Sequence, residues 1–264
     1  MQSAMTSGFK KPGILRASFH YQDLAAIGLL IDFYRAPDVY QWAEFDSDNP
    51  DFAAIEDVVL CRRDGRLEFT QVKFTVDPGD PANLLSWDWL LQRKGAGRSL
   101  LQKWAATVAQ HARAGTLASA ELFTGRRPAP DFAAALSGRH IDPAKIQKPI
   151  ADQIEGQIGA ADMALLFAHF RFRHSQPEIL ELEYDLQARL VPSDIDDAGW
   201  ATLGNAVKEW ATLKNRPAPD GRVRHHHIRA VISRDRPRPI RQDFEVPHGY
   251  RPPDVESTAP FARM

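Results

Sequence analysis

The chain has 264 residues, of which 44% are hydrophobic and 25% charged, and its net charge is −1. This length is enough to bury a real core, and the composition is typical of a soluble globular protein. No apolar run approaches the ~20 residues of a membrane helix, and residues 1–5 lack the layout of a signal peptide. A single cysteine, Cys61, excludes an internal disulfide framework and a cysteine-rich zinc site. We therefore expect a cytoplasmic protein without membrane contact.

The first half of the chain has the pattern of helices and strands in one α/β unit. Residues 21–34 carry apolar side chains at helical spacing and almost all round, which predicts a buried helix. Three strands are then expected, at 39–45, 58–61 and 67–74. Asp64-Gly65 between the last two strands is a hairpin signal. A helix at 99–114 and a returning strand at 118–124 complete the pattern of a mixed sheet with helices on its faces.

The second half of the chain is predicted to be mostly helical. Helices are expected at 161–169 and near 200–210, a strand at 223–232, and either a strand or a helix at 179–190. Beyond residue 234 repeated prolines predict an extended linker or tail. The fold class is therefore α/β (α+β), and the chain divides into three parts: a core at 8–130, a helical half at 131–233 and a tail at 234–264.

One side of the second hairpin strand carries an unusual lysine. Alternate side chains of a strand share a face, so Gln71 and Lys73 point the same way as Leu67 and Phe69. An ammonium group on such a face needs an anionic partner, and the hairpin can bring Asp57 beside it. A carboxylate, an amide oxygen and a lysine that converge at a sheet edge can hold a divalent metal and a phosphate. This combination predicts nuclease chemistry.

Metal-dependent hydrolysis of a phosphodiester assigns a role to each of these residues. Asp57 is the principal metal ligand, the side-chain carbonyl of Gln71 and the backbone carbonyl of Val72 are further ligands, and Lys73 is the electrostatic partner. Four more residues are possible contributors: Gln22, Asp23, Glu44 and Glu56. Gln71 weakens the metal assignment when spacing is considered alone, because an amide brings no charge.

The distribution of charge suits a phosphodiester substrate, although the net charge gives no argument for nucleic acid. Acidic residues crowd the stretch 46–57, and basic residues follow the candidate site. We expect six of them to contact DNA: Arg93, Lys94, Arg98, Lys103, Arg126 and Arg127. An acidic metal pocket flanked by basic patches would attract a polyanion. Ordinary solvated charge explains each patch equally well when it is taken alone.

The order of these elements resembles the PD-(D/E)xK restriction-endonuclease-like superfamily. That order is a helix, a strand, a strand that begins after Asp57, and a strand carrying (Asp/Glu/Gln)-x-Lys. More narrowly, His20-Tyr21-Gln22, Glu56-Asp57-Val58 and Thr70-Gln71-Val72-Lys73 look like the double-stranded DNA endonuclease domain of prokaryotic anti-phage effectors, which is related to Mrr-type nucleases. In that domain a glutamine is common in the (E/Q)xK position. The likeness covers most of residues 8–235.

This resemblance implies a mixed central sheet flanked by helices, in which 121–124 is the last core strand and 165–172 belongs to the helix that opens the second half. It implies Mg²⁺ (or Mn²⁺) bound by Asp57 and Gln71, with Lys73 acting on the phosphate or on water. Gln22 would lie at the rim of the pocket, and Glu44 is a lesser candidate. The implied partner is double-stranded DNA. A sensor or NTPase domain fused after the tail or associated with it, and clustering into a homo-oligomer, would switch on cleavage.

Two other functions stay open at this stage. The chain could be a catalytically silent module of the same fold that binds DNA or a protein, or a structural adaptor tethered by its tail. His225-His226-His227 is a separate feature. On a strand, His225 and His227 would share a face, which allows a metal site with two histidines as well as contact with solvent or DNA phosphate.

Overall fold

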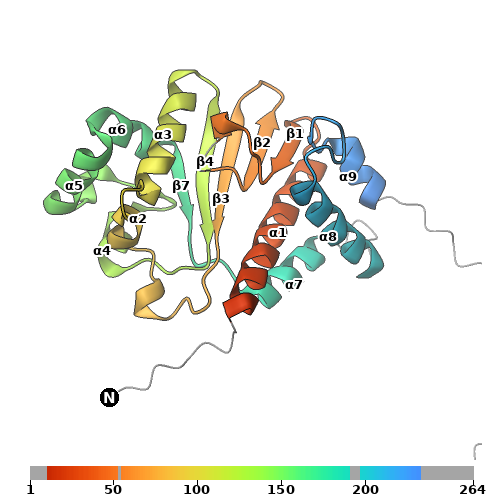
Figure 1. Ribbon diagram of the computed structural model, residues 1–264, viewed down its shortest axis with the longest axis horizontal. Coiled ribbons are helices and arrows are strands. Elements are labelled where there is room, and N and C mark those ends of the chain that lie inside the picture. The colour runs from red at the N-terminus through yellow and green to blue at the C-terminus, as the bar shows by residue number, and fades with distance from the viewer. Residues whose placement is uncertain (1–10, 53–54, 191–196, 233–264) are drawn as a thin grey trace, which may run out of the picture. The chain divides into compact units, whose positions relative to one another are not determined.

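A five-stranded mixed sheet with helices on both faces forms the centre of the molecule (Figure 1). The computed structural model describes residues 11–52, 55–190 and 197–232, so the predicted tail at 234–264 lies outside the described residues. In spatial order, the strands are β1 (Tyr40–Phe45), β2 (Val58–Arg62), β3 (Leu67–Lys73), β4 (Leu117–Thr124) and β7 (Phe170–Arg173). This architecture confirms the predicted mixed sheet flanked by helices.

The strand directions bring the ends of several strands to one edge of the sheet. β1, β2 and β3 are antiparallel neighbours, whereas β4 runs parallel to β3 and β7 runs parallel to β4. β1 and β3 therefore end where β2 begins, and Lys73 lies opposite Thr124 in the register. The β2–β3 hairpin turns at Asp64-Gly65 as expected, with Gly65 at a φ of +83° that favours glycine. Asp57 and Lys73 thus belong to the same sheet edge.

One face of the sheet is covered by α1 (Lys11–Arg35) together with helices from the end of the chain (Figure 1). These are α7 (Ile179–Leu190), α8 (Asp197–Thr212) and α9 (His225–Ile232). α1 begins about ten residues before the predicted helix and ends shortly before Pro37, since the residue before a proline disfavours helical backbone. Leu30 and Phe33 of α1 are fully buried in the hydrophobic core on this face of the sheet.

The opposite face is covered by the helices between β3 and β7 (Figure 1). They are α2 (Trp87–Leu91), α3 (Leu100–Arg113), α4 (Pro130–Ala135), α5 (Lys148–Ile158) and α6 (Ala160–His169). α3 begins with a capping box between Ser99 and Gln102 and stops before Gly115, whose φ is +69°. Trp104 of α3 stacks on Phe170 of β7 with ring centres 5.0 Å apart. No described helix is both long enough and apolar enough to cross a membrane.

Short elements complete the described part of the chain. Three 3-10 turns connect the longer elements and a two-stranded sheet precedes α5: η1 (Pro50–Phe52), η2 (Pro81–Asn83), η3 (Pro143–Lys145), β5 (Leu136–Ser137) and β6 (His140–Ile141). The described residues, 11–52, 55–190 and 197–232, form one compact unit.

Several predicted elements of the second half differ in the structure. The prediction of a strand at 223–232 is wrong. Only Val223 forms a β-bridge, to Ala43, and helix α9 follows it. Ile228 of α9 is buried in the core. Phe170–Arg173 is a strand rather than part of a helix, so β4 is not the last strand of the sheet. The segment left open at 179–190 is helix α7.

Candidate active site

Asp57 lies where β2 begins, beside the last residues of β3. Its carboxylate oxygen Oδ2 accepts a hydrogen bond from the side-chain amide of Gln71 and another from the backbone N–H of Val72, at 2.6 Å. Both bonds that the described residues give this carboxylate fall on the same oxygen. The hairpin therefore holds Oδ2 of Asp57 with two hydrogen bonds.

Burial and a nearby ammonium act on Asp57 in opposite directions. Removal from water raises the pKa of Asp57, while the positive charge of Lys73 and the two N–H donors hold part of this rise back. Gln71 is only 4% exposed, whereas Lys73 is half-buried. The lysine thus stands at the accessible side of the group and the glutamine on its inner side. Asp57, Gln71 and Lys73 come together as the sequence predicts.

Asp46 is a second acid at this edge, and it was not singled out from the sequence. It follows β1, and its backbone N–H donates to the carbonyl of Asp57 at 3.2 Å. Its φ of +43° lies in the left-handed region, which turns its side chain out of the strand alternation. The carboxylate then accepts a hydrogen bond from Gln22 of α1. Gln22 therefore reaches the site, as expected, through Asp46.

The other acids at this edge raise the proton affinity of Asp46. Burial, followed by the charge of Asp57, raises the pKa of Asp46 to about 6, while the hydrogen bond from Gln22 opposes the rise. Asp23 and Glu56 add further negative charge. Asp46 still contacts solvent, so water screens part of the effect. A carboxyl with this pKa exchanges its proton close to neutral pH, which is useful for general acid–base chemistry.

Glu44 does not join this group. It shares a face of β1 with Trp42, accepts a hydrogen bond from Ser47, and lies 3.9 Å from Nε of Arg222. Arg222 in turn lies over the ring of Trp42 at 4.1 Å. Strand alternation directs Glu44 toward this pair. The left-handed turn at Asp46, just after β1, brings that acid to Asp57 instead.

The donor set fits a magnesium ion that keeps several waters. The described residues contain no group of three or more His, Cys, Asp or Glu side chains that could hold a metal by itself. Asp57 and Asp46, with the amide oxygen of Gln71 and the backbone carbonyl of Val72, supply hard oxygen donors, and Mg²⁺ is usually bound through one or two carboxylates. Oε2 of Glu56 is buried with no hydrogen-bond partner among the described residues. A cation here would offset charge that Lys73 alone leaves uncompensated.

Comparison with known proteins adds no family to this geometry. No protein-family model matches the chain, and a search of curated proteins found no match. The arrangement of the side chains therefore carries the functional assignment.

The basic residues predicted to contact DNA fall into two groups. Arg93, Lys94 and Arg98 are exposed in the loop before α3, and two more are exposed at Lys103 and Arg127. Arg126 differs, because its guanidinium lies 4.5 Å from the ring centre of Trp89 and donates to the carbonyl of Leu84 at 3.3 Å. Arg126 thus holds the loop after β4 against α2, and the exposed group remains available for a phosphate backbone.

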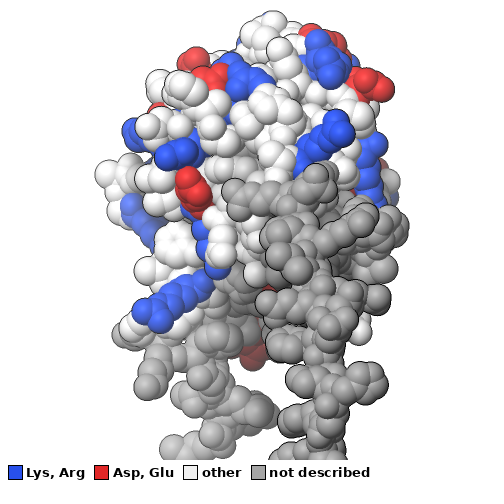
Figure 2. All heavy atoms as spheres, turned by 90° about the vertical axis from the view of Figure 1, so that its right-hand side faces the viewer, with Lys and Arg blue, Asp and Glu red and all other residues white. Residues whose placement is uncertain are grey.

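A further basic stretch lies around α8 and α9, on the face that Figure 2 presents. Lys and Arg side chains are scattered over this face between few acidic ones. Three of its arginines are paired: Arg216 with Glu209, Arg222 with Glu44 and Arg224 with Asp220. These ion pairs reduce the positive charge that the face offers to DNA.

The histidine run has a structural role on α9. The ring of His225 stacks on Tyr34 of α1, with centres 5.3 Å apart and planes at 6°. His227 accepts the backbone N–H of Arg224 at 3.0 Å through Nδ1, at the start of the helix. The expectation that His225 and His227 share a face depended on a strand, and the helix removes it.

Proposed function

We propose that this chain is a Mg²⁺- or Mn²⁺-dependent endonuclease that hydrolyses phosphodiester bonds of double-stranded DNA. The observation that carries the proposal is the convergence of Asp57, Gln71 and Lys73 at one sheet edge, with both N–H donors directed at one oxygen of Asp57. The order of helix, hairpin strands and parallel strand agrees with the resemblance to the PD-(D/E)xK superfamily. Asp46 and Gln22 extend the same group.

Each side chain has a role that follows from its place. Asp57 and Asp46 would hold the metal with the oxygens of Gln71 and Val72, and a bound Mg²⁺ would supply Lewis-acid stabilisation of charge on the phosphate. The amide of Gln71 fixes the orientation of Asp57. Lys73 carries a positive charge toward the phosphate and stabilises the negative charge that builds up there. Exposed basic residues beside the site would hold the DNA backbone.

The biological setting is proposed from the resemblance alone. A role in anti-phage defence, a cytoplasmic location, and activation by clustering through a sensor or NTPase domain are the properties of the protein class that the motifs resemble. A chain of net charge −1 would bind DNA weakly by itself, which supports a need for clustering.

Cleavage of supercoiled plasmid tests the proposal directly. With Mg²⁺ or Mn²⁺, the wild-type protein should convert supercoiled DNA to nicked and linear forms, and Lys73→Ala should not. Lys148→Ala is the matched control, since Lys148 is exposed on α5 and is not among the residues expected to contact DNA. Because the trigger is not specified by the site, the assay includes protein clustered on a bivalent scaffold.

A catalytically silent DNA-binding module is the second candidate, and one observation favours it. Gln71 brings no charge, and no group of three or more acidic or histidine ligands exists within the described residues. Such a module would bind duplex DNA equally well before and after Lys73→Ala, and would cleave nothing when clustered.

A further inference from the structure

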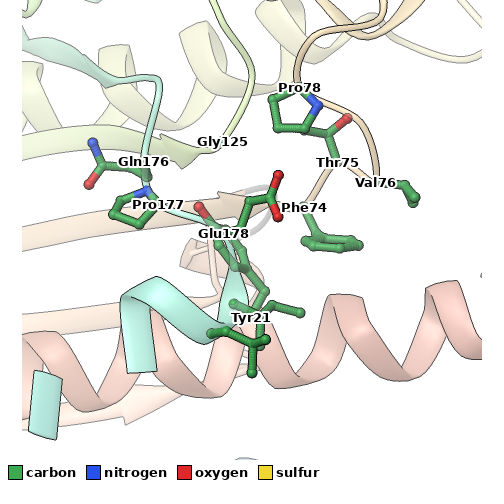
Figure 3. A pocket seen from close by; sticks show the side chains of 11 residues that line it. Tyr21, Phe74, Thr75, Val76, Pro78, Gly125, Gln176, Pro177 and Glu178 are labelled. Atoms are coloured by element: carbon green, nitrogen blue, oxygen red, sulfur yellow. The ribbon is translucent and has the colours of Figure 1, made fainter. Parts of the chain in front are cut away.

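A cavity of about 160 Å³ opens just past the ends of β3 and β4, and Lys73 is the last residue of β3 (Figure 3). Its walls come from α1, from the turns after β3 and β4, and from the segment that leads into α7. Six of the lining residues matter here: Tyr21, Phe74, Thr75, Gly125, Pro177 and Glu178. Engineered protein cavities of roughly 150 Å³ bind benzene, so this cavity has room for one flat ring.

The cavity and the candidate active site share two segments of the chain. Tyr21 lines the cavity and the next residue of α1, Gln22, binds Asp46. Phe74 and Thr75 follow Lys73 directly, and Thr75 is about 7 Å of extended chain beyond it. The cavity therefore begins one residue beyond Lys73 in the chain.

Two of the residues that line the cavity carry buried hydroxyl groups. The hydroxyl of Tyr21, whose side chain is 1% exposed, and that of Thr75, which is 8% exposed, have no hydrogen-bond partner among the described residues. Burial raises the pKa of Tyr21, so its hydroxyl stays protonated and can donate. Leaving such groups unpaired is costly, whereas a ligand with acceptors would satisfy them.

The rim of the cavity adds an acceptor and a cation. Glu178 lies at the rim as a carboxylate acceptor. A neighbouring hollow of about 390 Å³ shares Gly125 and Glu178 with the cavity and adds Arg127. The rings of Tyr21 and Phe74 form an aromatic wall, with centres 5.5 Å apart. The fitting ligand is a flat heterocycle that has both donors and acceptors and is attached to a phosphate.

We propose that the cavity receives one nucleobase of the DNA, rotated out of its stack beside the phosphate that is cleaved. This inference rests on the proposed nuclease function. Nucleobases combine a flat aromatic ring with a donor and acceptor edge, and enzymes that extrude a base hold it by stacking and by hydrogen bonds to that edge. Tyr21 and Thr75 would donate to the base, Glu178 would accept from an amino group, and Arg127 would hold the neighbouring phosphate.

Fluorescence of 2-aminopurine tests the proposal without cleavage. Duplexes with 2-aminopurine at successive positions are bound in EDTA, and binding is followed separately by anisotropy. Wild-type protein should raise the fluorescence at one position, because an unstacked 2-aminopurine is no longer quenched. Gly125→Val should abolish the rise while DNA still binds. A Cβ at Gly125 would lie 3.8 Å from the Tyr21 hydroxyl, so the added side chain would take up space in the cavity. Its nearest backbone atom, the carbonyl oxygen of Gln176, would lie at 3.4 Å, which is an ordinary contact that the fold should tolerate.

A second variant guards against misfolding. Tyr21→Phe keeps the ring and removes only a hydroxyl without a partner, so it should fold as well as wild type while weakening capture of the base about threefold to tenfold, as expected for one hydrogen bond. Tyr40→Phe is the matched control, because its hydroxyl binds Glu68 at 3.2 Å far from the cavity. It should leave the fluorescence unchanged. Gly204→Val controls for added bulk, since the space around Gly204 is open.

The outcomes separate this inference from the proposed function. A fluorescence rise that Gly125→Val removes supports base capture, even if the plasmid is never cleaved. DNA binding without a rise at any position, or a rise that Gly125→Val leaves intact, overturns it, even if cleavage is efficient. Free nucleosides that bind the cavity, without any signal from DNA, also overturn it.

Discussion

The side-chain amide of Gln71 donates a hydrogen bond to the carboxylate of Asp57, across the β2–β3 hairpin. Because Gln71 is almost fully buried, its amide cannot be replaced by solvent as a donor. Glutamine at this position is therefore a neutral residue that orients the principal acid, where a carboxylate would repel it. The hydrogen bond stabilises the site without a metal, but a glutamine offers a metal one negative charge fewer than a carboxylate would.

Gln71→Glu exchanges this hydrogen bond for a second buried carboxylate. In EDTA we expect the variant to lose about 1–3 kcal/mol of unfolding free energy, the cost of leaving buried partners unsatisfied. Mg²⁺ should restore more stability to the variant than to wild type, because binding to the native state stabilises it in proportion to affinity. Thermal melting across a Mg²⁺ titration measures both effects.

Gln41→Glu, at an exposed position of β1, is the control and should melt like wild type. Equal melting of Gln71→Glu and wild type in EDTA, with no added effect of Mg²⁺, would contradict the account of Gln71.

Asp46 should make stability depend on pH in the metal-free protein. Its pKa is raised to about 6 in the native state from an ordinary 3.8, so the native state binds the proton more tightly than the unfolded state. The charged form therefore destabilises the fold above pH 6, and this penalty fades as the pH falls from about 6 toward 4. Asp46→Asn should raise the melting temperature at pH 8 and have little effect at pH 4.

Asparagine also tolerates the left-handed backbone at this position, which makes Asp46→Asn a clean substitution. Melting curves in EDTA at pH 4, 6 and 8 provide the comparison. The opposite order, with the variant gaining stability only at low pH, would show that Asp46 is not held in this environment.

Arg126 and Arg127 are adjacent but should behave differently. Arg126→Ala removes the stacking on Trp89 and the hydrogen bond to Leu84, and should destabilise the fold by about 1–2 kcal/mol. Arg127→Ala should leave stability unchanged, and should weaken DNA binding and reduce its salt dependence by roughly one phosphate contact. Urea unfolding and anisotropy at several salt concentrations separate the two effects. Equal losses of stability in both variants would refute the distinction.

Trp104 is expected to be a core residue rather than a platform for bases. It is fully buried and stacked on Phe170. Trp104→Ala should cost about 3–5 kcal/mol of unfolding free energy. Trp104→Phe should cost much less, since the indole Nε1 has no hydrogen-bond partner among the described residues. Urea unfolding gives both values, and a Trp104→Ala protein of normal stability with impaired DNA binding would reverse the assignment.

The sequence predicts the elements that local chemistry determines. The helix α3 is marked by the Ser99 cap and Gly115, and the hairpin by Asp64-Gly65, so both appear where they were expected. The segment at 223–232 misleads because its Val and Ile residues favour a strand, while packing of Ile228 against the core selects a helix. Tertiary contacts overrule local preference there.

The candidate site is predictable to the same extent. Asp57 and Gln71 meet because a hairpin joins them, and a hairpin is visible in the sequence. Asp46 reaches the site through its own left-handed backbone, and the cavity at Tyr21 is built from four separate segments. Neither leaves a periodic pattern in the chain, so only the folded structure reveals them.

The proposed nuclease activity is measured as cleavage of supercoiled plasmid by wild type and by Lys73→Ala, at matched concentration and with the proteins clustered. We expect metal-dependent nicking and linearisation that EDTA abolishes. Lys73→Ala should lose about 10²–10³-fold in rate, the range found when one charge-stabilising donor is removed. Lys148→Ala should cleave like wild type. If wild type cleaves nothing under any of these conditions, or if Lys73→Ala cleaves at the wild-type rate, the chain is not the nuclease proposed here.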